Sequence, residues 1–411
     1  MDLAVETCGD LGAAACGGAV MDGGVGLAAE RAGLAAAPPS ASPAGSTEQP
    51  YFPITERPET YIVPTVFAFI FVVGAVGNGT LVFLFARYPN MRNVPNMYIL
   101  SLALGDLLVV VFAVPFVSII FITDTWPYGE PICRLSEFMR DVSVGVTVFT
   151  LTALSADRYL AIVDPVGRRA GAVARRSTVL ATAVIWGFAL LLASPAALFS
   201  HLSMEHTGNG TIVICYPFPT WLGGVYPRVN VLAKLIVYYL LPLLIISTFY
   251  LLMARHLMRA SSALPGEAAQ QQQQQRARHM AARRKVARMV LAFVVIFAVC
   301  YFPNHVFMVW FYFNPNVEHD YNHYWNAFRC IGFCLAFFNS CVNPIALYCI
   351  SGAFRKSFNR HLFCCLCPEE ARGRAWTTLR LRSSDQHFHS TLRKTDHYDM
   401  STLNGPDKAA V

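Results

Sequence analysis

Residues 97–122, MYILSLALGDLLVVVFAVPFVSIIFI, form an apolar stretch with one charged residue, Asp106. A helix needs about 20 apolar residues to cross the hydrocarbon core of a bilayer, and this stretch is longer than that. The whole chain is 55% hydrophobic and only 14% charged, against about 25% charged residues in an ordinary soluble domain. Similar stretches occupy residues 61–86, 133–162, 178–199, 230–254, 286–313 and 325–350. The sequence therefore predicts an all-α membrane protein, a seven-transmembrane helix bundle.

Lys and Arg residues predict how the bundle is oriented, because they gather in cytoplasmic loops. The loops after the first, third and fifth stretches are rich in them, whereas the loops after the second, fourth and sixth contain only Arg228. We therefore expect an extracellular N-terminus. The net charge of +7 does not indicate a nucleic-acid partner, because the basic residues lie between apolar stretches and not on one polar domain.

Composition divides the chain into four expected segments. Residues 1–58 are rich in Ala, Gly, Pro and Ser, which is typical of disorder, and residues 352–363 mix Phe with Lys and Arg, which is typical of an amphipathic helix. The segments are a disordered extracellular tail at 1–58, a seven-span domain at 59–351, an amphipathic helix on the membrane surface at 352–363 and a cytoplasmic tail at 364–411.

Three short patterns indicate covalent modification or a linker. Cys364, Cys365 and Cys367 follow the amphipathic segment and are predicted palmitoylation sites, with plain free thiols as the alternative. Asn209 begins an Asn-Gly-Thr glycosylation sequon in a loop expected outside the cell. The run Gln270–Gln275 is expected to be a flexible linker.

Asp106 lies in the middle of its apolar stretch, where an ionisable residue is costly and therefore indicates function. It could be a protonated, hydrogen-bonded carboxyl group, or it could bind a small hard cation such as sodium together with neighbouring amides and hydroxyls. No other cofactor is expected. The residues predicted for the sodium site are Asp106, Thr147, Asn339 and Asn343.

Short motifs also recur in the stretches in a fixed order. They are Gly77-Asn78, Leu102–Asp106, Asp157-Arg158-Tyr159, Trp186, Pro242 with Tyr250, Cys300–Pro303 and Asn343-Pro344. Together they resemble the rhodopsin-like G-protein-coupled receptors over about residues 60–365. The segments 143–152, 303–305 and 339–348 more narrowly resemble bombesin-type neuropeptide receptors, and among these the invertebrate CCHamide receptors.

The resemblance implies a plasma-membrane receptor for an amidated neuropeptide that signals through heterotrimeric G proteins, of the Gq class, and raises calcium. It also implies that arrestin and receptor kinases bind the C-terminal tail. The alternatives are a receptor for a different bombesin-type peptide and, remotely, a transporter, although the spans show no inverted repeat. An enzyme is not expected, because the chain lacks an HExxH motif and a serine elbow.

The resemblance further assigns residues to roles. A disulfide is implied between Cys133 and Cys215. Activation and G-protein coupling are implied for Asp157, Arg158, Tyr159, Tyr250, Tyr301, Asn343, Pro344 and Tyr348. Three positions depart from related receptors: Arg283 replaces an acidic residue of rhodopsin, Tyr301 replaces a Trp, and Phe333 replaces an Arg of vertebrate bombesin receptors.

The ligand is expected to bind among polar and aromatic side chains. Arg140 occupies the position where amine receptors have an aspartate, and its charge would repel an amine, so a peptide is favoured. Asp141 is expected to pair with a nearby cation. The predicted ligand-binding residues are Arg140, Asp141, Asn304, His305, Phe311 and Arg329.

Overall fold

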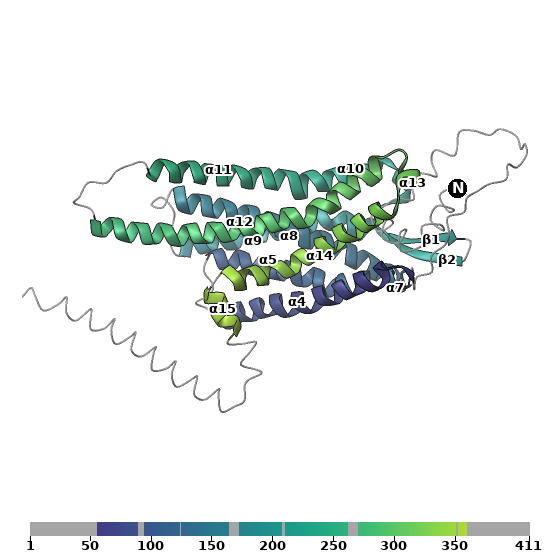
Figure 1. The fold of residues 1–411 in the computed structure, drawn as a ribbon, viewed down its shortest axis with the longest axis horizontal. Coiled ribbons are helices and arrows are strands. Elements are labelled where there is room, and N and C mark those ends of the chain that lie inside the picture. Colours follow the sequence, from purple (N-terminus) through teal and green to yellow (C-terminus); the bar gives the residue numbers. More distant parts are fainter. Residues whose placement is uncertain are drawn as a thin grey trace, which may run out of the picture. The chain divides into compact units, whose positions relative to one another are not determined.

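Long helices run side by side along one axis (Figure 1). The computed structural model describes residues 56–88, 94–123, 125–163, 172–207, 210–261, 270–350 and 352–359. Seven spans in it are long and apolar enough to cross a membrane, which confirms the predicted fold class. The helices up to residue 350 are α4 (Glu59–Arg87), α5 (Val94–Phe112), α6 (Val114–Val117), α7 (Ile120–Thr123), α8 (Gly129–Val163), α9 (Ala172–Phe199), η4 (Thr220–Leu222), α10 (Val225–Leu235), η5 (Ile236–Leu240), α11 (Leu241–Ser261), α12 (Gln270–Phe313), α13 (Val317–Asp320) and α14 (His323–Ile350).

The outer faces of the helices are apolar. Leu180 and Leu191 of α9 and Leu244 of α11 are each about two-thirds exposed (67%, 67% and 66%). Helices that are apolar on all sides need an apolar surrounding, because water would leave such side chains unburied. These faces are therefore suited to lipid.

The α-helical hydrogen-bond pattern is interrupted next to two prolines, which have no N–H group to donate. Pro115 lies in the first turn of α6, after Ala113 has ended the regular helix that began with α5. Pro242 follows the π-helical turn η5, in which the N–H of Leu241 donates to the carbonyl of Ile236. A π turn of this kind is a usual way for a helix to accommodate a disturbed hydrogen-bond ladder.

A two-stranded hairpin lies at one end of the bundle (Figure 1). Strands β1 (His201–Thr207) and β2 (Gly210–Tyr216) pair antiparallel, with Leu202 opposite Cys215. A disulfide joins Cys215 to Cys133 at the start of α8, as the family resemblance implies, and the two Cα atoms are 5.5 Å apart. The N–H of Trp126 donates to the carbonyl of Val213 at 2.7 Å, which ties the loop before α8 to the same strand. We call this end of the bundle the hairpin end, and the opposite end, where α8 finishes, the Arg158 end.

The glutamine run differs from the prediction, because Gln270–Gln275 forms the first turns of α12 and not a flexible linker. Gln has a good helix propensity, and the Ala- and Arg-rich residues that follow continue the helix without a break. After residue 350 the chain forms a separate unit, of which the helix α15 (Gly352–Phe358) is described by itself. The tail up to residue 55, Asn209, and residues 360–411 with Cys364, Cys365 and Cys367 lie outside the described residues.

At Gly77, α4 packs closely against α14. A Cβ atom at this position would lie only 2.6 Å from Cγ of Pro344, a ring that cannot rotate away. We expect Gly77→Ala to destabilise the protein by about 1–3 kcal/mol, the usual effect of overpacking, and to lower the melting temperature in detergent. Gly79 is the matched control on the same helix, because nothing lies within 4 Å of a Cβ there. Equal melting temperatures for the two variants would contradict this account of Gly77.

Candidate functional site

A cavity of about 90 Å³ lies among α8, α10, η5, α12 and α14. This volume holds several water molecules, so it suits a small group or the end of a longer chain and not a whole folded ligand. Apolar side chains such as Phe333 and Phe337 form one part of its wall. Six of its polar wall residues are Arg140, Asp141, Asn230, Lys234, Asn304 and His305. Four of these are among the predicted ligand-binding residues.

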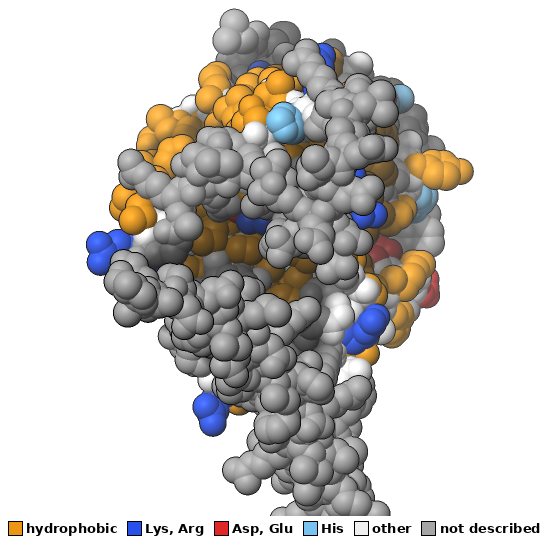
Figure 2. All heavy atoms as spheres, turned by 90° about the vertical axis from the view of Figure 1, so that its left-hand side faces the viewer, with side chains coloured by type: hydrophobic (Ala, Val, Ile, Leu, Met, Phe, Trp, Pro, Cys, Tyr) orange, Lys and Arg blue, Asp and Glu red, His pale blue; other side chains and the backbone are white. Residues whose placement is uncertain are grey.

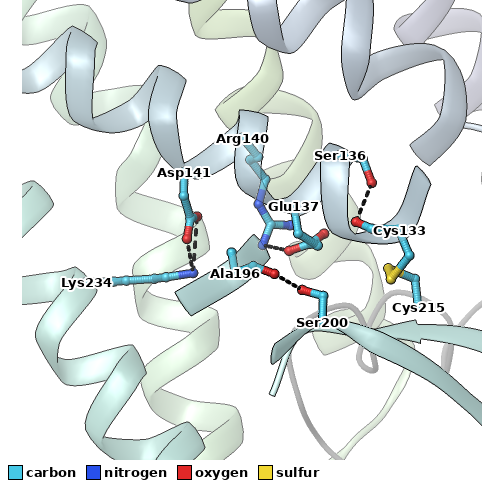
Figure 3. Close-up of polar contacts among 9 residues, drawn as sticks. All are labelled: Cys133, Ser136, Glu137, Arg140, Asp141, Ala196, Ser200, Cys215 and Lys234. Carbon is cyan, nitrogen blue, oxygen red and sulfur yellow. Dashed lines mark hydrogen bonds and ion pairs between the residues drawn. A yellow bond between two sulfur atoms is a disulfide. The ribbon is translucent and has the colours of Figure 1, made fainter. Parts of the chain in front are cut away.

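Two ion pairs neutralise the charges of the cavity wall (Figure 3). The guanidinium of Arg140 donates to the carboxylate of Glu137 at 2.5 Å, one turn earlier on α8. The ammonium of Lys234 on α10 lies 2.9 and 3.1 Å from the two carboxylate oxygens of Asp141. Consecutive helical residues point about 100° apart, which is why Arg140 and Asp141 reach different partners. The cation expected beside Asp141 is therefore Lys234.

Aromatic side chains connect the cavity to the middle of α12. The ring of His305 packs on Tyr239, with centroids 4.8 Å apart, and the Tyr239 hydroxyl donates to the carbonyl of Ala298 at 2.9 Å. Below His305, Tyr301 packs on Phe297 at 4.7 Å. His305, Tyr301 and Phe297 all lie on α12, so these ring contacts connect the cavity wall to the part of α12 on either side of Pro303.

Phe311 and Arg329 lie outside the wall of this cavity. Arg329 is buried nearer the hairpin end and donates to Asn326 at 2.8 Å, and Asn326 in turn contacts Glu59 of α4 and the hydroxyl of Tyr321. Burial raises the pKa of Tyr321, and its protonated hydroxyl donates to Asn326. Phe311 packs edge-on against Tyr321. These two residues help to join α12, α14 and α4, and their role in ligand binding stays a prediction.

The residues around Asp106 fit a small cation. Asp106 is fully buried, and its Oδ2 accepts a hydrogen bond of 2.7 Å from Asn343. Its Oδ1 and the Thr147 hydroxyl are both buried and have no hydrogen-bond partner among the described residues. Gly105 lies against Val146, so the neighbouring Asp106 and Thr147 occupy the same level of the bundle. Buried oxygen atoms of this kind are the ligands that a hard cation prefers. Asn339 is also buried, on the same helix as Asn343.

At the Arg158 end, the Arg158 guanidinium pairs with the adjacent Asp157 carboxylate, and both side chains are largely buried. The hydroxyl of Tyr250 on α11 donates to the carbonyl of Ala287 on α12 at 2.8 Å. Tyr159 packs on Phe249 with ring centroids 5.5 Å apart. The predicted activation residues therefore bring α8, α11 and α12 together here. Pro344 packs against α4 instead, at Gly77, and Tyr348 lies further along α14.

Exposed arginines surround the Arg158 end. An end view shows Lys and Arg side chains around its edge and apolar side chains between them (Figure 2). This arrangement suits a partner with acidic groups and an apolar contact surface. Among the residues whose side chains the structure describes, the exposed arginines of α4, α9, α11 and α12 toward this end are Arg87, Arg175, Arg176, Arg255, Arg284 and Arg288.

Sequence reasoning missed Glu137, Lys234 and Tyr238 as parts of the site. Glu137 could have been found, because a carboxylate three residues before Arg140 on a helix lies on the same face. Lys234 gave no such signal, because its position in the fifth span faces Asp141 only after the bundle has formed. Tyr238 lines the cavity from the π-helical turn η5, and such a turn shifts the helical phase relative to a regular α-helix.

Known proteins match most of the chain. A family described as "7 transmembrane receptor (rhodopsin family)" matches residues 77–348. The Neuropeptide CCHamide-1 receptor of Drosophila melanogaster is 54% identical over 323 residues, which are 78% of this chain and 64% of that receptor, so the chain spans less than two thirds of its length. A bombesin receptor of Bombina orientalis is 37% identical over 308 residues, which are 74% of this chain and 76% of that receptor. The chain belongs to the rhodopsin family of seven-transmembrane receptors, a family of receptors and not of enzymes.

Proposed function

We propose that this protein is a plasma-membrane receptor for an amidated neuropeptide of the CCHamide kind. The observation that carries the proposal is a neutralised polar cavity near the hairpin end of a chain that is 54% identical to a CCHamide-1 receptor. The end of a peptide fits its volume, and its paired charges and amides offer donors and acceptors to peptide groups. The carboxylates of Glu137 and Asp141 are already paired with cations, so they are poor partners for a simple amine.

The bound peptide would activate a heterotrimeric G protein at the Arg158 end. The hairpin end and the N-terminus would face outward, and the exposed arginines would face the cytoplasm, as the positive-inside rule favours. We propose coupling to the Gq class and a calcium response. Asn209 would be glycosylated outside, and Cys364, Cys365 and Cys367 palmitoylated inside, where arrestin and receptor kinases would act on the tail.

The test is a calcium assay in cells that express the full chain with an epitope tag. The cells are exposed to a panel of amidated neuropeptides that includes CCHamide-1, and surface expression is measured on the same cells. We expect a saturable calcium response to CCHamide-1 and none in untransfected cells. Robust surface expression without a response to any peptide would overturn the ligand class. A peptide response carried by another G protein would overturn only the Gq coupling.

We also propose that Asp106, Thr147, Asn339 and Asn343 hold a sodium ion that opposes agonist binding. An ion that stabilises the described arrangement must, by linkage, weaken any ligand that favours a different one. Replacing choline by sodium at constant ionic strength is expected to lower agonist affinity about fivefold or more. Asp106→Asn removes the charge that would hold the ion, so the agonist affinity of this variant should not depend on sodium. Equal sodium effects in the two proteins, measured by peptide binding to membranes, would exclude Asp106 from the site.

A further inference from the structure

The Asp141–Lys234 ion pair connects two different helices inside the cavity wall (Figure 3). Lys234 reaches from α10 to both carboxylate oxygens of Asp141 on α8. The Asp141 side chain is 9% exposed and the Lys234 side chain 27% exposed, so the pair is largely shielded but open on the cavity side. A partly shielded pair of this kind can accept a ligand group between its members, whereas a fully buried pair cannot.

The remaining charge of the wall is already balanced. Arg140 is held by Glu137, whose side chain is 1% exposed. A ligand carboxylate entering the cavity would therefore meet the Asp141 carboxylate without gaining an unopposed cation. Repulsion between like charges in such a shielded place is strong.

A further polar group lies beside the pair. Tyr238, one helical turn after Lys234, lines the same cavity. Its hydroxyl is buried and has no hydrogen-bond partner in the part of the chain that the structure describes. A buried hydroxyl in this state is costly, and a ligand group that hydrogen-bonds to it removes that cost.

We propose that Asp141 and Lys234 recognise the C-terminal carboxamide of the ligand, an inference that rests on the proposed function. A primary amide carries two N–H donors and one carbonyl acceptor. Its NH₂ group would donate to Asp141, and its oxygen would accept from the Lys234 ammonium, with the Tyr238 hydroxyl as an additional partner. A free C-terminal carboxylate has acceptors only, so it can satisfy Lys234 but not Asp141. The pair thus selects an amidated peptide over the free acid.

The test compares CCHamide-1 in its amidated and free-acid forms on the wild type and two variants. The wild type is expected to prefer the amide by about tenfold to a hundredfold in potency, the usual effect of a mismatched hydrogen bond to a charged group. Asp141→Asn removes the repelling charge and adds a donor, so this preference should fall to about threefold or less. Lys234→Gln leaves Asp141 without its cation, so the preference should widen by about threefold or more.

The amide preference should fall in one variant and widen in the other, and this difference separates recognition of the carboxamide from a purely structural ion pair. If the pair only holds α8 to α10, both variants should weaken the two peptides equally and leave the ratio unchanged, and this would overturn the inference. Glu130→Gln is the matched control, because it breaks an exposed ion pair with Arg134 on the same helix, and its ratio should equal that of the wild type. Equal potency of both peptides on the wild type would overturn the inference alone. No response to either peptide would overturn the proposed function and the inference with it.

Discussion

Replacement of Arg158 by Ala is expected to abolish agonist-stimulated signalling and to leave peptide affinity within about threefold of the wild type, because distant sites contribute nearly independently. Arg158 lies at the opposite end of α8 from the cavity residues Arg140 and Asp141. Its side chain is largely buried against Asp157. The next residue, Tyr159, packs against the apolar cluster that joins α8, α11 and α12. Signalling is measured as calcium release in cells, and peptide affinity is measured separately by binding to membranes from the same cells.

The complementary change, Asp157→Asn, is expected to raise basal signalling, which is the signalling measured without ligand. Asn keeps the shape of Asp but loses the charge that pairs with Arg158. If this pair favours the resting arrangement, its loss shifts the population toward the active one, and ligand-independent signalling should rise several-fold, on the order of the shift that about 1 kcal/mol produces.

Leu180→Ala is the control for both variants, because Leu180 is exposed on the outer, apolar face of α9 and does not belong to the arginine surface at the Arg158 end. It should change the maximal calcium response by less than about twofold, as most exposed substitutions have small effects. Full agonist responses from Arg158→Ala, at surface expression equal to that of the wild type, would show that Arg158 is dispensable for coupling.

The spans could be predicted from sequence because membrane insertion depends on a local property, an apolar run of sufficient length. The predicted run 97–122 and the observed span Val94–Thr123 differ by only a few residues at each end. Residues 211–217 alternate enough to favour a strand, and the structure has the strand β2 at Gly210–Tyr216. These features need no knowledge of distant residues.

The details of the cavity could not be predicted, because they depend on contacts between spans. The partner of Asp141 is Lys234, 93 residues further along the chain. Arg329 was expected in the ligand site, but it lies outside the cavity and contacts Asn326, which is three residues earlier on the same helix. Whether a side chain of a span reaches the cavity depends on how its helix is rotated about its own axis. A turn such as η5 changes that rotation locally.

Removal of the Cys133–Cys215 disulfide is expected to be the most damaging change at the hairpin end. The two cysteines are 82 residues apart in sequence, and closing a loop of that length stabilises the folded chain by about 4–5 kcal/mol in the chain-entropy description. Cys215 also lies three residues before Phe218, which lines the cavity. Loss of the bond should therefore lower the melting temperature and reduce peptide potency by about tenfold or more, since about 1.4 kcal/mol of lost binding energy has that effect.

Potency and melting temperature, compared between the single and double cysteine variants, test whether the disulfide bond itself is responsible. Cys133→Ser and Cys215→Ser each break the same bond, so the double variant should be no worse than either single one. Cys349→Ser removes an exposed free thiol of α14 and should leave potency and melting temperature unchanged. If the two single effects added together in the double variant, each cysteine would act through its own packing, and the hairpin would not depend on the bond. Non-additive effects with an unchanged Cys349→Ser control would mean that the disulfide itself holds the hairpin and the chain leading to Phe218 against the start of α8.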